Sequence, residues 1–102
     1  MRAVFSDAAV EDLESIERYI LSYRDEPFLD RFEGELAALV RSIAEHPWSR
    51  PIYQFPPGAE PQMEYRSANV YNFKLFYRVD ESSDRVIVYR ILHSRSDFTR
   101  VL

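Results

Sequence analysis

A strand predicted over residues 85–93 and the tail behind it carry most of the side chains that could do chemistry. The strand's β-branched and aromatic residues are typical of a buried strand, yet ionisable side chains lie within it and directly after it. A rigid strand holds such side chains at fixed positions, so we expect this end of the chain to contact a target. The residues in question are Arg90, His93, Arg95, Asp97 and Phe98.

One chemistry open to such residues is the metal-free cleavage of RNA. It needs a group that activates the ribose 2′-hydroxyl, cations for the phosphorane and an acid for the leaving oxygen. Histidine titrates near neutral pH, so His93 suits an acid or base role. Arg66, Arg78 and Arg90 suit phosphate binding, and adjacent strands could bring all four residues to one face of the sheet.

Arg90 and His93 also have structural interpretations. His93 at a strand end can hydrogen-bond with Asp97 or with the backbone, and we favour this interpretation over catalysis. Arg90 can pair with a carboxylate of the predicted helices, such as Glu17 or Glu35, and would then fix how the helices dock on the sheet. A bulge in the last strand would reverse the faces of Arg90 and His93, so the pattern leaves their orientation open.

The composition is that of a small globular protein without cysteine chemistry. The chain has 102 residues, 46% hydrophobic and 15% aromatic, which suits one compact domain over residues 1–102. The absence of cysteine excludes disulfides, and two distant histidines disfavour a metal site, so we predict no metal and no other cofactor. No signal peptide or membrane-length apolar segment is visible, which predicts a cytoplasmic protein without membrane contact.

Charge is distributed unevenly along the chain. The formal net charge is −4, from 17 acidic and 13 basic residues. Residues 1–50 carry 11 acidic and 6 basic side chains, net −5, whereas residues 51–102 carry 6 and 7, net +1. An acidic first half repels nucleic acid, and the second half offers at best a local basic patch.

Hydrophobic periodicity predicts one strand, two amphipathic helices and then three strands. Short connections make the last three strands antiparallel, whereas the partner of the first strand is not determined. The prediction is therefore an α+β fold, β-α-α-β-β-β, with a helical hairpin packed on a mostly antiparallel four-stranded sheet. The predicted elements are strand 2–5, helices 7–24 and 27–46, and strands 62–68, 70–79 and 85–93.

Phe76 has an unusual position within its predicted strand. It lies on the polar face between Lys74 and Arg78, whereas its aromatic neighbours alternate on the other face. An exposed aromatic side chain flanked by cations is typical of an anchor for a partner segment. Trp48 and Tyr53 extend this interpretation, although packing of their proline-rich loop is the simpler one.

Over nearly its full length the chain resembles the RelE/ParE superfamily of bacterial toxins from type II toxin–antitoxin modules. This resemblance implies the same β-α-α-β-β-β fold, a cytoplasmic toxin, a cognate antitoxin that neutralises it and a role such as plasmid stabilisation. The matching segments are Val4 to Ile20, His46–Pro47, Tyr65–Arg66, Phe73 to Asp80, and Val86 to His93 with Arg95 and Asp97.

The two branches of the superfamily imply different activities. ParE-like toxins inhibit DNA gyrase by binding it, whereas RelE-like toxins cut messenger RNA on the ribosome. The C-terminal segment resembles the ParE branch; RelE-like nucleases are strongly basic and often have a tyrosine near the C-terminus, where this chain has Phe98. The leading hypothesis is a gyrase inhibitor without catalytic residues. The alternatives are a ribosome-dependent endoribonuclease that uses the three arginines and His93, and a non-toxic antitoxin-binding module.

The resemblance also implies two interfaces. The antitoxin is expected to be partly disordered when free and to add a helix or strand in an apolar groove between the helical hairpin and the sheet edge. A toxin–antitoxin heterotetramer is one assembly that the resemblance allows. The C-terminal tail is the expected site for gyrase. The side chains expected to contact the antitoxin are Leu13, Tyr23, Phe76, Trp48 and Tyr53.

Overall fold

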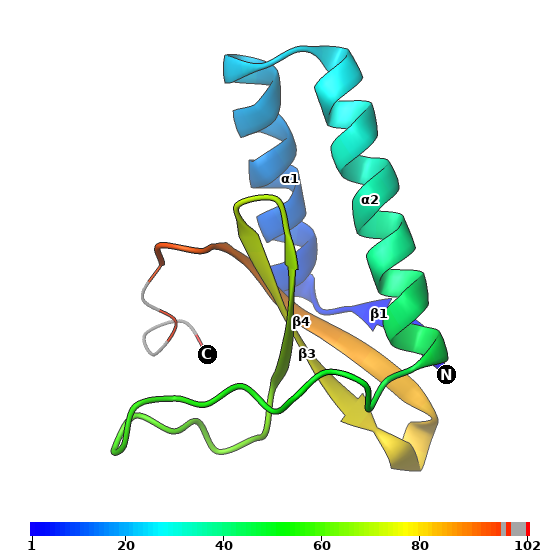
Figure 1. Ribbon diagram of the computed structural model, residues 1–102, viewed down its shortest axis with the longest axis vertical. Helices are drawn as coiled ribbons and strands as arrows, with labels where there is room; N and C mark the ends of the chain where they lie inside the picture. Colours follow the sequence, from blue (N-terminus) through cyan, green and yellow to red (C-terminus); the bar gives the residue numbers. More distant parts are fainter. Residues whose placement is uncertain (97, 99–101) are drawn as a thin grey trace.

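The computed structural model describes residues 1–96, 98 and 102, and two helices cover one face of a four-stranded sheet within this part of the chain (Figure 1). The predicted α+β class and the predicted order of elements are confirmed. A short 3₁₀ turn, Glu81–Ser83, joins the last two strands. The elements are β1 (Arg2–Phe5), α1 (Asp7–Tyr23), α2 (Glu26–Glu45), β2 (Arg66–Val70), β3 (Phe73–Asp80) and β4 (Arg85–His93).

The sheet is mixed. Its order is β1-β4-β3-β2; β2, β3 and β4 pair antiparallel, whereas β1 lies at the edge and pairs parallel with β4. The pairing of the first strand, which the sequence left open, is therefore with the last one. Because Phe5 at the end of β1 pairs with Val88, no strand among the described residues lies on that side of the remainder of β4 up to His93.

A polar side chain caps the N-terminus of each helix. The Ser6 hydroxyl accepts from the N–H of Ala9 at 3.0 Å and donates to the carbonyl oxygen of Tyr89 at 2.7 Å, so it caps α1 and also ties it to β4. Asp25 caps α2 by accepting from the N–H of Phe28 at 3.1 Å. The helices then run side by side as a hairpin (Figure 1).

The main core lies between this hairpin and the sheet. Apolar side chains at three- and four-residue spacing on each helix pack onto alternate residues of the strands, as the periodicity predicts. Burial of this apolar area is the main contribution to the stability of the fold. The core residues include Ile16, Ile20, Phe32, Leu36, Ile43, Leu75, Tyr77, Val86, Val88 and Ile91.

A second aromatic cluster covers the opposite face of the sheet. Aromatic residues of the 46–65 segment pack there together with Phe98 and Leu102, and Phe76 at the centre is fully buried, with its ring 4.9 Å from that of Phe98 and 5.2 Å from that of Tyr53. The prediction of an exposed Phe76 is therefore wrong: its strand face is polar in sequence, but these side chains exclude water from it. The cluster comprises Tyr53, Phe55, Tyr65, Phe76, Tyr89, Leu92, Phe98 and Leu102.

A bulge in β4 sets which way its last residues face. Phe76 pairs with Arg90 but Tyr77 pairs with Val88, so Tyr89 is an extra residue. Before the bulge Val88 faces the helices; after it Ile91 does so, and Arg90 is displaced from the helical core. The sequence pattern left open whether a bulge reverses the faces of Arg90 and His93, and the structure shows that it does.

Asp12 of α1 occupies the edge of β4 that β1 leaves uncovered. Its carboxylate accepts from Nε of Arg90 at 2.7 Å, from Nη2 of Arg90 at 2.9 Å and from the N–H of Ile91 at 3.0 Å. The predicted ion pair between Arg90 and the helical hairpin is thus present, but its partner is Asp12, and the prediction of Glu17 or Glu35 is wrong. These bonds raise the pKa of the Arg90 guanidinium.

Asp12→Ala is expected to lower the free energy of unfolding by about 3 kcal/mol, because it removes the carboxylate that pairs with the partly buried Arg90 and accepts from the N–H of Ile91. Urea unfolding followed by circular dichroism measures the change. Glu11→Ala, at the exposed neighbouring position, is the matched control and should change the value by less than about 0.5 kcal/mol. Equal losses in the two variants would contradict a role for Asp12 in docking α1.

Candidate functional site

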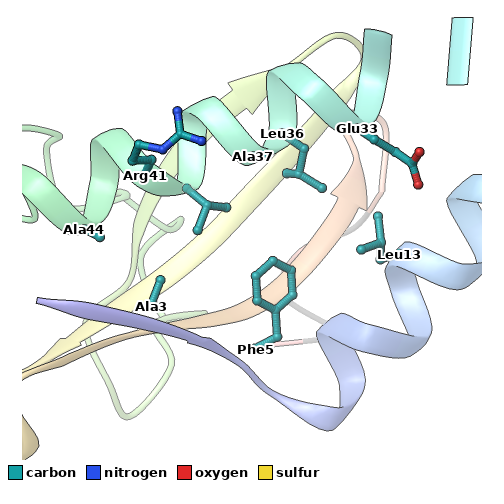
Figure 2. A pocket seen from close by; sticks show the side chains of 9 residues that line it. Ala3, Phe5, Leu13, Glu33, Leu36, Ala37, Arg41 and Ala44 are labelled. Carbon is teal, nitrogen blue, oxygen red and sulfur yellow. The ribbon is translucent and has the colours of Figure 1, made fainter. Parts of the chain in front are cut away.

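An apolar groove of about 440 Å³ lies where α2 crosses above β1, with α1 closing one end (Figure 2). Small side chains leave this space open: Ala3 on β1, and Ala37 and Ala44 on α2. The groove agrees in position with the one expected between the hairpin and the sheet edge. Its lining residues are Ala3, Phe5, Leu13, Glu33, Leu36, Ala37, Val40, Arg41 and Ala44.

Of these, sequence reasoning had singled out Leu13 alone as a partner contact. The signal that could have found the others is on α2, where Ala37, Arg41 and Ala44 recur at three- and four-residue steps beside the core stripe. Such a row marks a second face of α2, made of small side chains and one arginine, beside the face that packs on the sheet.

Charged residues stand at the two ends of the groove. Glu33 lies beside Leu13 at the end that α1 closes, and Arg41 lies toward the other end (Figure 2). The side chain of Glu33 is hydrogen-bonded to that of Glu17 on α1. This hydrogen bond, partial burial and the negative charges of Glu33 and Glu14 together raise the pKa of Glu17 to about 7.

The free edge of β1 borders the same groove. The N–H of Arg2 donates to Asp84 and that of Ser6 donates to Val88, at 3.3 and 2.9 Å, so these even-numbered residues face β4. Because backbone direction alternates along a strand, the polar backbone groups of Ala3 and Phe5 point away from the sheet. An edge of this kind can pair with an added strand.

Two of the four predicted ribonuclease residues share a second hollow, of about 250 Å³. Arg66 and Arg78 line it together with Trp48, Met63 and Glu64. Arg66 donates to the carbonyl oxygen of residue 50, and its guanidinium lies 5.2 Å from the ring centroid of Trp48. Nε of Arg78 is buried without a hydrogen-bond partner among the described residues.

The other two ribonuclease candidates lie elsewhere. Arg90 is engaged by Asp12, and Arg78 pairs with Ile87, six residues from His93 along β4, which corresponds to about 20 Å. The structure therefore does not gather the two cations of the hollow around the only histidine of the strand. Nδ1 of His93 accepts from the N–H of Arg95 at 3.1 Å, one of the two structural interpretations of this residue.

The residues predicted to bind a target also lie at different places in the structure. His93 and Arg95 are exposed at the end of β4, and His93 lines a hollow of about 270 Å³ with Tyr19 and Tyr23 of α1. Phe98 packs into the second aromatic cluster, and Asp97 lies outside the described residues.

The five predicted antitoxin contacts do not form one surface. Leu13 lines the groove, and Tyr23 is 73% exposed at the end of α1. Trp48 is 51% exposed beside Arg66, whereas Tyr53 packs on the buried Phe76 on the far side of the sheet.

Within the described residues, no helix is long and apolar enough to cross a membrane. Nor does this part of the chain contain a group of three or more His, Cys, Asp or Glu side chains arranged to hold a metal ion.

The chain matches the family model described as "ParE toxin of type II toxin-antitoxin system, parDE" over residues 3–98. No curated protein matches it. The match runs from β1 through the whole sheet to Phe98, so it includes the hairpin, the groove and the end of β4. The chain therefore belongs to the ParE toxin family of type II toxin–antitoxin systems.

Proposed function

We propose that this protein acts in the cytoplasm as a one-domain toxin that inhibits DNA gyrase by binding it, without catalysing a reaction, and that a cognate antitoxin neutralises it. The observation that carries the proposal is the separation of the candidate catalytic groups, added to the family match. Metal-free RNA cleavage requires a base, an acid and cations around one phosphate. Here the arginine hollow and His93 lie at different ends of the sheet.

Neutralisation by an antitoxin is supported by the groove and the β1 edge. The groove is lined almost entirely by apolar side chains, and the strand beside it presents outward-facing backbone groups. An antitoxin segment that folds on binding can fill the groove and pair with the β1 edge.

Gyrase binding is proposed for the end of β4 and the adjoining part of α1. His93 and Arg95 are exposed there next to Tyr19 and Tyr23, and these aromatic and cationic side chains are of the types enriched at binding hot spots. Phe98, in contrast, packs into the second aromatic cluster.

The ribonuclease alternative retains one supporting observation, the hollow that Arg66 and Arg78 share with Trp48. Two guanidinium groups beside an exposed indole suit a phosphate and its base. The non-toxic alternative is an outcome of the first experiment below.

Purified protein is expected to inhibit supercoiling by purified gyrase, and its expression without antitoxin is expected to induce DNA-damage signalling before translation falls. Supercoiling assays and pulse labelling of new protein, run in parallel, measure the two effects. Cut transcripts with normal supercoiling would favour the ribonuclease alternative instead. No effect on either process would favour a non-toxic antitoxin-binding module.

The double variant His93→Ala, Arg95→Ala is expected to weaken gyrase inhibition at least tenfold, since it removes two exposed side chains at the proposed contact. The concentration that half-inhibits supercoiling measures the loss. Arg2→Ala serves as the control, because Arg2 is exposed and pairs with Arg85, at the end of β4 opposite to His93. Unchanged inhibition by a folded double variant would exclude this surface.

Ala37→Trp is expected to weaken antitoxin binding at least tenfold, because the indole fills the groove. Calorimetric titration with the product of the short reading frame beside the toxin gene measures this affinity. Ala38→Trp places the same side chain at the next exposed position, which does not line the groove. Equal affinities for the two variants would place the antitoxin elsewhere.

A further inference from the structure

The groove is electrically asymmetric along its length. Glu33 and Arg41 both line the groove from α2, eight residues and therefore about 12 Å apart along the helix axis. In Figure 2 the Glu33 carboxylate lies near Leu13, and the Arg41 guanidinium points away from the strand. Between them the groove presents Leu36, Ala37 and Val40, none of which can form a side-chain hydrogen bond. A bound segment thus meets an acidic end, an apolar middle and a basic end.

The acidic end contains two carboxyl groups. Glu17 from α1 is hydrogen-bonded to Glu33 from α2, so one of the two carries a proton in that state. The charged group that adds to them from α1 is Glu14, whereas β1 contributes apolar Ala3 and Phe5 to the groove. Two carboxyl groups that share a proton form a site in which a cation can replace that proton.

We propose that the groove binds the antitoxin in one direction, with a lysine or arginine at the Glu17–Glu33 pair, small or aliphatic side chains in the middle and an aspartate or glutamate at Arg41. This inference rests on the proposed function, in which the groove receives the antitoxin, and adds the chemistry and the polarity of the segment. A reversed segment would place like charges together at both ends, which disfavours it.

A proton must leave when the antitoxin's cation binds. In the free protein the pKa of Glu17 is raised to about 7, so most molecules retain this proton at pH 6 and most have lost it at pH 8. The cation favours both carboxylates in their ionised form, so the proton passes to solvent on binding. Affinity therefore rises with pH through 7 and levels off above it, because free protein that must first lose a proton binds more weakly.

The test is calorimetric titration of the full chain with the product of the neighbouring short reading frame at pH 6 and pH 8. For the unchanged protein we expect binding about tenfold tighter at pH 8, as follows for a group that titrates near pH 7. Glu17→Gln should match it at pH 6 and bind about tenfold more weakly at pH 8. Asp30→Asn, exposed on α2 away from the groove, should retain the full pH dependence.

Charge reversal tests the direction. Arg41→Glu and Glu33→Arg should each weaken binding at pH 8 about tenfold. For each, an antitoxin with the complementary reversed charge should restore the affinity. Circular dichroism confirms folding, which we expect because Glu33 and Arg41 are exposed.

The outcomes separate this inference from the proposed function. If Ala37→Trp abolishes binding while Glu17→Gln retains the wild-type affinity and pH profile, the groove receives the antitoxin but the polarity is overturned. If Ala37→Trp binds normally, the antitoxin does not use the groove and both statements fail. Loss of binding in both charge reversals without rescue by the complementary antitoxins would also overturn the assigned direction.

Discussion

The fold depends on one carboxylate that takes the place of a missing strand. Asp12 accepts three hydrogen bonds at the edge of β4, two from Arg90 and one from the backbone of Ile91. A short β1 leaves this edge unpaired, and an unpaired backbone N–H that is partly buried costs free energy. By supplying the acceptor from α1, Asp12 docks the first helix against the last strand. That docking holds α1 beside the part of β4 that β1 does not cover.

The two faces of the sheet serve different purposes because different segments cover them. The helices cover one face with mainly aliphatic packing, whereas the 46–65 segment and Phe98 cover the other with aromatic rings around Phe76. Arg66 and Arg78 line a hollow with Trp48 of this segment, whereas the exposed His93 lies on the helical side, beside α1. The bulge at Tyr89 reverses which of the last residues of β4 face the helices, so Ile91 packs in the helical core and His93 lies beside Phe73.

Some of the acidic residues in the first half of the chain lie together in the structure. Glu17 of α1 and Glu33 of α2 meet across the hairpin, at one end of an apolar groove whose other end is basic. Like charges held together are unfavourable in the free protein, and a partner that brings a cation relieves this repulsion. In the proposed complex, the binding energy depends on the partner's charge order as well as on its apolar surface, which favours a cognate segment over others.

The local sequence pattern was sufficient to predict both helices and the last strand. The three- and four-residue spacing from Ala9 to Tyr23, the Ser6 and Asp25 caps and the proline after His46 reflect short-range sterics and hydrogen bonds, so both helices and β4 could be predicted within a residue or two. Long-range packing could not be predicted in this way. The burial of Phe76 depends on a loop and a tail distant in sequence, and the choice of Asp12 over Glu17 as the partner of Arg90 depends on where β1 ends. The groove exists because three alanines from two elements meet, and only the tertiary arrangement brings Glu17 and Glu33 within hydrogen-bonding distance.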